Sequence, residues 1–179
     1  MIEMNDSKFL NFIELANKLY QMDQRVTIIG SVAYYIYTGE KFDDFEMDIV
    51  TTSPVIRELL ESWDYIKVVN LPEIEEIKKK LGYEGVNDPR QTFFLDPSDK
   101  TIIDLSLREK NDYETQVVKV HGYEVRVPTL RQLIEIHQKA SERKDIPEYK
   151  REAYKQKTEH LKKLEKNVIE KEKIIIVSF

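Results

Sequence analysis

Hydrophobic and polar residues follow two different periods along the chain, and each period predicts one type of element. An apolar spacing of three and four residues predicts an N-terminal helix that starts near Asp6 or Ser7, because such positions share one helical face. The apolar positions of this face are Phe9, Phe12, Ile13, Ala16 and Leu19. Short runs rich in β-branched residues predict strands. These runs lie at residues 25–29, 46–50, 66–69, 92–95, 101–107, 115–120 and 123–127.

Start and stop signals place helices between the strands. Ser53 as the cap and Pro54 in the first turn are typical of a helix start, and Gly82 is typical of a helix end. Thr129 can cap the helix that follows it. The predicted helices cover residues 32–37, 54–63, 72–81, 130–144 and 147–171. The apolar tail at residues 174–177 predicts a short strand that adds to a sheet edge or to a partner.

Helices that alternate with strands around a mixed sheet indicate an α/β or α+β fold. A length of 179 residues suits one core domain with an appendage. After residue 128 the pattern is helical apart from the short tail. We therefore predict a core domain over residues 1–128 and a C-terminal helical region with a terminal strand over residues 129–179.

Composition narrows the class of protein. Hydrophobic residues make up 41% of the chain, which is enough for a core. No stretch approaches the roughly 20 apolar residues that cross a bilayer, and the N-terminus lacks the basic and apolar regions of a signal peptide. The sequence has no cysteine, so a metal site would rest on oxygen or imidazole ligands. These features predict a cytoplasmic protein without membrane contact.

Charge is distributed unevenly along the chain. Residues 131–173 carry 13 Lys and Arg against 9 Asp and Glu, whereas the rest of the chain carries 15 against 24. A basic C-terminal part on an acidic body can bind a polyanion such as RNA or a nucleotide. The alternative is a solvated helix surface on which both signs are interspersed.

Two carboxylates lie two residues apart in one predicted strand, and a third lies in a later strand. Because side chains of a strand alternate between its faces, Glu46 and Asp48 share one face, while Met47 and Ile49 point into the core. Asp104 interrupts an apolar strand, where an isolated carboxylate is costly unless it is paired or bound to a metal. We therefore predict that the three carboxylates converge.

A divalent cation would relieve the repulsion among three converging carboxylates. Ligands that are all oxygen favour Mg2+ or Mn2+, and such ions can grip a triphosphate and activate a hydroxyl group. Gly30 and Ser31 lie where a buried strand gives way to a helix. The N–H groups and the positive helix end at such a junction suit a phosphate.

This ordered set resembles the motif of the minimal nucleotidyltransferase superfamily, which has a palm like that of polymerase β. The motif residues here are Gly30, Ser31, Glu46, Asp48 and Asp104. Residues 125–130, with the sequence Val-Arg-Val-Pro-Thr-Leu, precede a helix with basic residues, as in the AbiEii-like branch related to toxin–antitoxin systems. The resemblance spans residues 25–165.

The resemblance implies a nucleotidyltransferase fold and the metal-dependent transfer of a nucleoside monophosphate from an NTP to a hydroxyl group. The acceptor is an RNA such as tRNA, a protein or a small molecule. The implied catalytic and metal-binding residues are Glu46, Asp48 and Asp104, with Asp104 as the base. The implied nucleotide-binding residues are Gly30, Ser31, His137, Lys139 and Arg143. Lys139 and Arg143, four residues apart, would share one helical face.

Three departures from the family pattern leave a second interpretation open. Glu46 stands where aspartate is commoner, and His137 stands where this branch often has lysine. The spacer from Ser31 to Glu46 is also longer than the commonest one. The alternative is a nucleotidyltransferase fold used as a catalytically weak binding protein, such as one component of a toxin–antitoxin pair. A basic residue of the 130–144 helix within reach of the carboxylates would favour the enzyme.

Overall fold

The computed structural model describes residues 4–42, 44, 46–68, 91–96, 98 and 101–177. The predicted helix at residues 72–81 lies outside this part of the chain. The chain divides into two compact units, Met1–Pro128 and Thr129–Phe179. Within the described residues, no helix combines the length and the apolar character needed to cross a bilayer.

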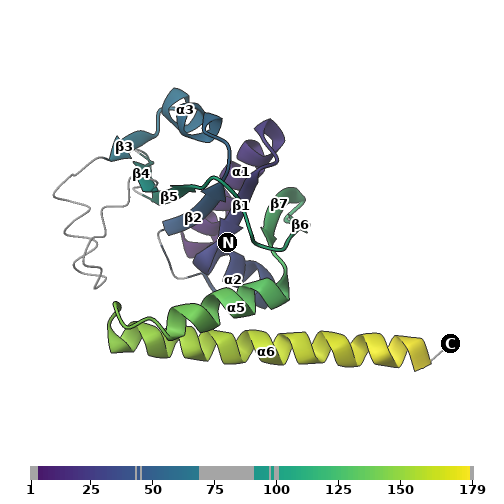
Figure 1. Cartoon of the computed structure of the whole chain (residues 1–179). Helices are drawn as coiled ribbons and strands as arrows, with labels where there is room; N and C mark the ends of the chain where they lie inside the picture. The colour runs from purple at the N-terminus through teal and green to yellow at the C-terminus, as the bar shows by residue number, and fades with distance from the viewer. Residues whose placement is uncertain are drawn as a thin grey trace. The chain divides into compact units, whose positions relative to one another are not determined.

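The first unit is built on a mixed five-stranded sheet (Figure 1). Its order is β1 (Val26–Ile29), β2 (Glu46–Thr51), β5 (Ile102–Leu107), β4 (Gln91–Leu95) and β3 (Ile66–Val68). Only the central pair, β2 and β5, is parallel, and the other neighbours are antiparallel. Helices flank this sheet, so the predicted fold class is confirmed.

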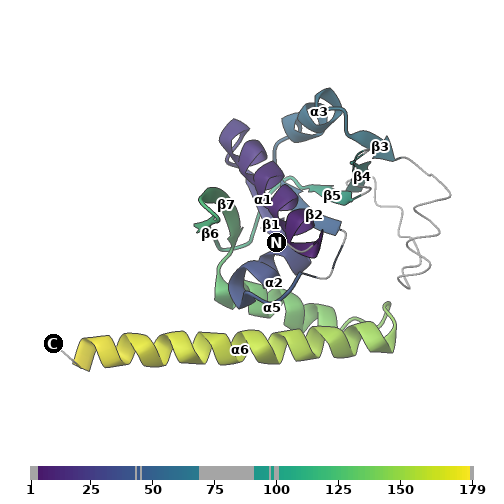
Figure 2. The ribbon, with the colours of Figure 1, turned by 180° about the vertical axis from the view of Figure 1, so that it is seen from behind.

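Three helices lie in the described part of this unit, namely α1 (Met4–Met22), α2 (Gly30–Thr38) and α3 (Val55–Ser62). The predicted apolar face of α1 is buried at Phe12, Ile13, Ala16 and Leu19. α1 packs against β1 and against β7 (Tyr123–Pro128), the last strand of the unit (Figure 2). The apolar spacing of the first helix therefore identified the face that joins the core, although the helix begins earlier than predicted.

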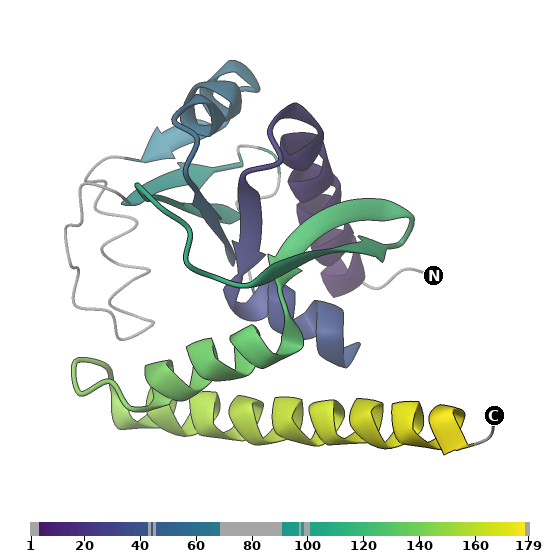
Figure 3. The same ribbon diagram turned by 45° about the vertical axis from the view of Figure 1, so that its right-hand side comes forward.

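A hairpin of β6 (Thr115–Val120) and β7 (Tyr123–Pro128) forms a separate two-stranded sheet (Figure 3). His121 and Gly122 make its turn, with φ of 49° and 84°. Two positive φ angles are what a two-residue hairpin turn requires. Tyr37 on α2 donates a hydrogen bond to the carbonyl of Pro128 at 2.6 Å, which ties the end of β7 to the helix beside the candidate site.

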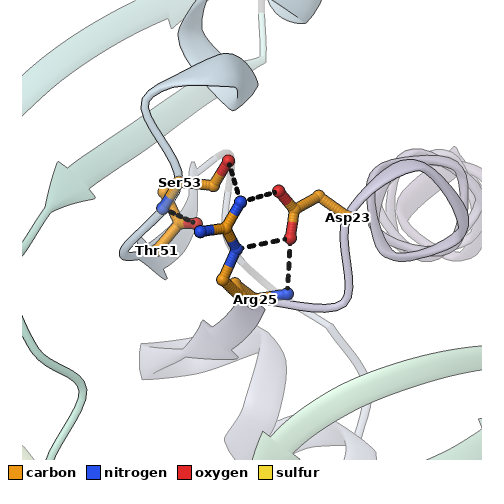
Figure 4. Close-up of polar contacts among 4 residues, drawn as sticks. All are labelled: Asp23, Arg25, Thr51 and Ser53. Atoms are coloured by element: carbon orange, nitrogen blue, oxygen red, sulfur yellow. Dashed lines mark hydrogen bonds and ion pairs between the residues drawn. The ribbon is translucent and has the colours of Figure 1, made fainter.

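A polar network joins the start of β1 to the end of β2 (Figure 4). The guanidinium of Arg25 donates to both carboxylate oxygens of Asp23 at 3.0 and 2.8 Å and to the hydroxyl of Ser53 at 3.3 Å. The N–H of Ser53 donates to Thr51 at 3.0 Å. Ser53 was predicted to cap α3, but Pro54 occupies the N-cap position and no side chain caps this helix. That prediction was wrong because the helix begins one residue later than expected, and the Ser53 hydroxyl accepts a hydrogen bond from Arg25 instead.

The second unit consists of α5 (Leu130–Ser141) and α6 (Glu148–Val177), which pack against each other. Thr129 caps α5 as predicted, because its hydroxyl accepts a hydrogen bond from the N–H of Gln132 at 3.3 Å. The short strand predicted at residues 174–177 is wrong, since α6 continues to Val177. Extending an existing helix needs no new nucleus, and this outweighs the weak strand preference of β-branched residues.

Candidate active site

The parallel pairing of β2 with β5 sets the geometry of the acidic site. Asp48 lies directly opposite Asp104 in the register, and Glu46 lies two residues before Asp48 on the same face. One ligand oxygen from each of the three carboxylates lies within 4.8 Å of the others. Met47 and Ile49, on the opposite face of β2, are 0% and 1% exposed. The core therefore fixes the strand that carries the two acids.

These distances suit one shared cation. Two oxygens that each bind the same ion at roughly 2.0–2.6 Å lie at most about 5 Å apart. The oxygens of Glu46, Asp48 and Asp104 meet this limit without movement of the strands. All three are hard ligands of the kind that Mg2+ and Mn2+ prefer. The donor set therefore fits a divalent cation.

The electrostatics of Asp48 point to the same conclusion. Burial raises the pKa of Asp48 well above its ordinary value, and the nearby charges of Glu46, Asp104 and Asp44 raise it further. A carboxylate in such surroundings is stable as an anion only when positive charge arrives. A bound cation would supply that charge.

Glycine is required at position 30 because the backbone there lies very close to the Asp48 carboxylate. It is the first residue of α2 and has a φ of 66°, a conformation that favours glycine. A Cβ at this position would overlap Oδ2 of Asp48 and lie 3.0 Å from its Cγ. Ile29 holds the N-cap position and makes no side-chain cap hydrogen bond. The start of α2 therefore lies against the acidic site, with the Asp48 carboxylate beside Gly30.

Asp44 is a fourth acid at the site, and the sequence analysis missed it. The hydroxyl of Ser31 donates a hydrogen bond to Oδ2 of Asp44 at 2.6 Å. A signal was present, because residues 44, 46 and 48 follow the alternation of one strand face. The segment before residue 46 was not predicted as a strand, so this alternation was not extended to Asp44.

Gln91 is the second residue of the site that the sequence analysis missed. Its side-chain nitrogen lies 2.8 Å from Oδ1 and 2.7 Å from Oδ2 of Asp104. The predicted strand began one residue later, at Thr92. No motif marked Gln91, because only the pairing of β4 with β5 brings it to Asp104.

The three basic candidates of the second unit have different surroundings. His137 is 2% exposed, donates a hydrogen bond from Nδ1 to the carbonyl of Leu133 at 3.0 Å, and packs edge-on against Tyr154 of α6. Lys139 is exposed in the last turn of α5. Arg143 follows the end of α5 and pairs with Asp145.

The predicted helical face shared by Lys139 and Arg143 is wrong. The N–H groups of Glu142 and Arg143 bond to carbonyls three residues back, at 3.2 and 3.3 Å, and this tighter turn closes the helix. The sequence pattern had extended the helix to residue 144. The burial of His137 likewise gives it a packing role between α5 and α6 rather than a place on an open surface.

The buried imidazole of His137 predicts an acid-sensitive second unit. Burial lowers its pKa to about 4 from 6.5, with the Leu133 carbonyl acting in the opposite direction. Because the folded state favours the neutral ring, the resulting stability is complete above pH 6.5 and is lost as pH falls toward 4. The loss is at most about 3 kcal/mol.

Urea unfolding followed by circular dichroism between pH 7 and 4 tests this expectation. His137→Phe should unfold with a shallower pH dependence than the wild type, and His160→Phe, at a half-buried histidine of α6, is the control. An equal pH dependence in wild type and His137→Phe would contradict the role assigned to the ring.

Comparison with known proteins places this arrangement in a recognised fold. No family model matches the sequence, and no curated protein matches it. Among solved structures, an antigenic nucleotidyltransferase-like protein from Paracoccidioides brasiliensis is similar with a TM-score of 0.55 and 10% identity. The similarity covers 93% of this chain and 89% of that one.

The antibiotic-resistance factor ANT(2'')-Ia is similar with a TM-score of 0.54 and 12% identity, over 98% of this chain and 100% of that one. The chain therefore has a nucleotidyltransferase fold, as the motif predicted. At these identities the similarity defines the fold, and the chemistry must be argued from the residues of the site.

Proposed function

We propose that the protein is a metal-dependent nucleotidyltransferase of the AbiEii-like branch, acting in the cytoplasm on an RNA, protein or small-molecule acceptor. The observation that carries this proposal is the convergence of Glu46, Asp48 and Asp104 within 4.8 Å on a nucleotidyltransferase fold. A carboxylate whose pKa lies well above its ordinary value, as that of Asp48 does, is a feature of functional centres.

In the proposed reaction, an acceptor hydroxyl oxygen bonds to the α-phosphorus of an NTP. The bond from that phosphorus to the bridging oxygen of the β-phosphate breaks, and pyrophosphate leaves. Asp104 takes the proton of the hydroxyl. Glu46, Asp48 and Asp104 would hold Mg2+ or Mn2+, which neutralises phosphate charge and lowers the pKa of the attacking hydroxyl.

Gly30 and Ser31 are proposed to bind the phosphates of the nucleotide. The N–H groups at the start of α2 lie beside the acids, and a helix start favours negative charge. Ser31 already donates a hydrogen bond to a carboxylate oxygen, that of Asp44. A phosphate oxygen presents the same kind of acceptor.

Label transfer tests the proposal directly. The protein is incubated with Mg2+, total RNA or cell lysate, and each NTP labelled at the α-phosphorus, with γ-labelled NTPs as the control for phosphoryl transfer. Transfer of the α-label alone supports the proposal. A metal-dependent nucleotide complex without any transfer would favour the second candidate, a catalytically weak binding protein of the toxin–antitoxin kind. The burial of His137 and the ion pair of Arg143 with Asp145 support that candidate.

We propose that Lys139 supplies positive charge to the leaving pyrophosphate. Lys139→Ala is expected to weaken NTP affinity several-fold at low salt and less at high salt, because ionic screening reduces charge effects. Stability should change little, since an exposed charge contributes little to folding. Lys163→Ala, another exposed lysine of this unit, is the control in a nucleotide titration at two salt concentrations. Equal affinities of Lys139→Ala and wild type at low salt would exclude Lys139 as the contact.

A further inference from the structure

Gln91 contacts the candidate metal site from a neighbouring strand. It is the first residue of β4, and its amide nitrogen donates to both carboxylate oxygens of Asp104 on β5, at 2.8 and 2.7 Å. The two residues are not directly opposed, because Gln91 pairs with Ser106 and Phe93 pairs with Asp104. A diagonal neighbour of this kind is reached only by a long side chain.

The alternation of β4 places Gln91 on the same side of the sheet as the acids. Thr92 and Phe94 are 6% and 0% exposed and occupy the opposite, core-facing side. The core therefore fixes the backbone of β4, and the register with β5 fixes where the Gln91 amide can reach. Its position does not depend on a loop.

A neutral amide is a better hydrogen-bond donor to a metal-binding carboxylate than a positively charged side chain would be. Groups that hydrogen-bond a ligating carboxylate set the orientation of its oxygens. A lysine or arginine at this place would pair with Asp104 and cancel the charge that attracts a cation. A neutral amide orients the carboxylate and leaves its charge in place.

We propose that Gln91 is a positioning residue that fixes the plane of the Asp104 carboxylate for a cation shared with Glu46 and Asp48. This inference rests on the proposed function, because Gln91 would support a ligand of the same metal site. Asp104 lies opposite Asp48 in the register, so a rotation of its carboxylate removes one of the three converging oxygens. Gln91 prevents that rotation through two hydrogen bonds.

The test is Mn2+ binding, measured by electron paramagnetic resonance and by the metal-induced rise in melting temperature. Gln91→Met keeps the length of the side chain but removes the donors, and it should bind Mn2+ about tenfold more weakly than the wild type or worse. Gln21→Met, at an exposed glutamine of α1, is the matched control and should bind as the wild type does.

Gln91→Asn separates positioning from stability, because its amide is polar but too short for the diagonal contact. It should fold like the wild type and also bind Mn2+ more weakly. If Gln91→Met lowers the melting temperature equally with and without Mn2+, Gln91 is merely structural and the inference is overturned. Unchanged affinity in Gln91→Met overturns it as well. Failure of the wild type to bind Mn2+ would instead overturn the proposed function.

Discussion

Asp48→Asn is expected to lower α-label transfer by at least about a hundredfold, because removal of a direct ligand should exceed the 10–100-fold effect typical of outer partners of a metal. Asp48 is the central acid of the site, since its carboxylate responds to the charges of Glu46, Asp104 and Asp44. An asparagine keeps the shape of the side chain and loses its charge. Asp112→Asn, at a side chain that is 73% exposed, is the control.

The same variant should be as stable as the wild type or more so in metal-free buffer at neutral pH. The pKa of Asp48 is raised in the folded state, so its favourable contribution to folding is present below pH 3.8 and is lost as pH rises through the raised pKa. Asparagine carries no such charge. Thermal unfolding in the presence of a chelator measures this difference. Transfer by Asp48→Asn at the wild-type rate would contradict the role of this carboxylate.

Gly30→Ala is expected to destabilise the first unit and to abolish transfer. Its left-handed backbone alone costs an L-residue about 1–2 kcal/mol. The added methyl group must also displace the Asp48 carboxylate, which it would overlap. The free energy of unfolding should therefore fall by more than this backbone cost.

Gly39→Ala is a close control for this prediction. Gly39 has nearly the same φ, 65° against 66°, yet a Cβ there meets nothing within 4 Å. The difference between the two variants in urea unfolding therefore isolates the contact with Asp48. Equal losses of stability, with transfer retained in Gly30→Ala, would contradict the close packing of α2 on the site.

The sequence predicted the central elements of the fold because their signals are local. The apolar spacing of α1 and the alternation of Glu46 and Asp48 in β2 depend only on neighbouring residues. The convergence of Asp104 with this pair was predicted from the cost of an isolated carboxylate in an apolar strand. Each of these signals is strong because a buried face accepts few residue types other than apolar ones.

The remaining features depend on contacts between distant residues. Gln91 joins the site only through the register of β4 with β5, which no local pattern encodes. The end of α5 before Arg143 follows from the tightening of its last turn, while the apolar spacing alone had allowed a longer helix. The β-branched composition of the tail at residues 174–177 predicts a strand, but the tail extends the existing helix α6.

The most direct test of the central claim is a crystal structure of the protein grown or soaked with Mn2+, with anomalous diffraction recorded for the metal. We expect an anomalous peak bounded by oxygens of Glu46, Asp48 and Asp104 at roughly 2.0–2.6 Å. The same peak should be absent from crystals of Asp48→Asn. A Mn2+ ion bound elsewhere in the wild type, or no ion between these three carboxylates, would contradict the account.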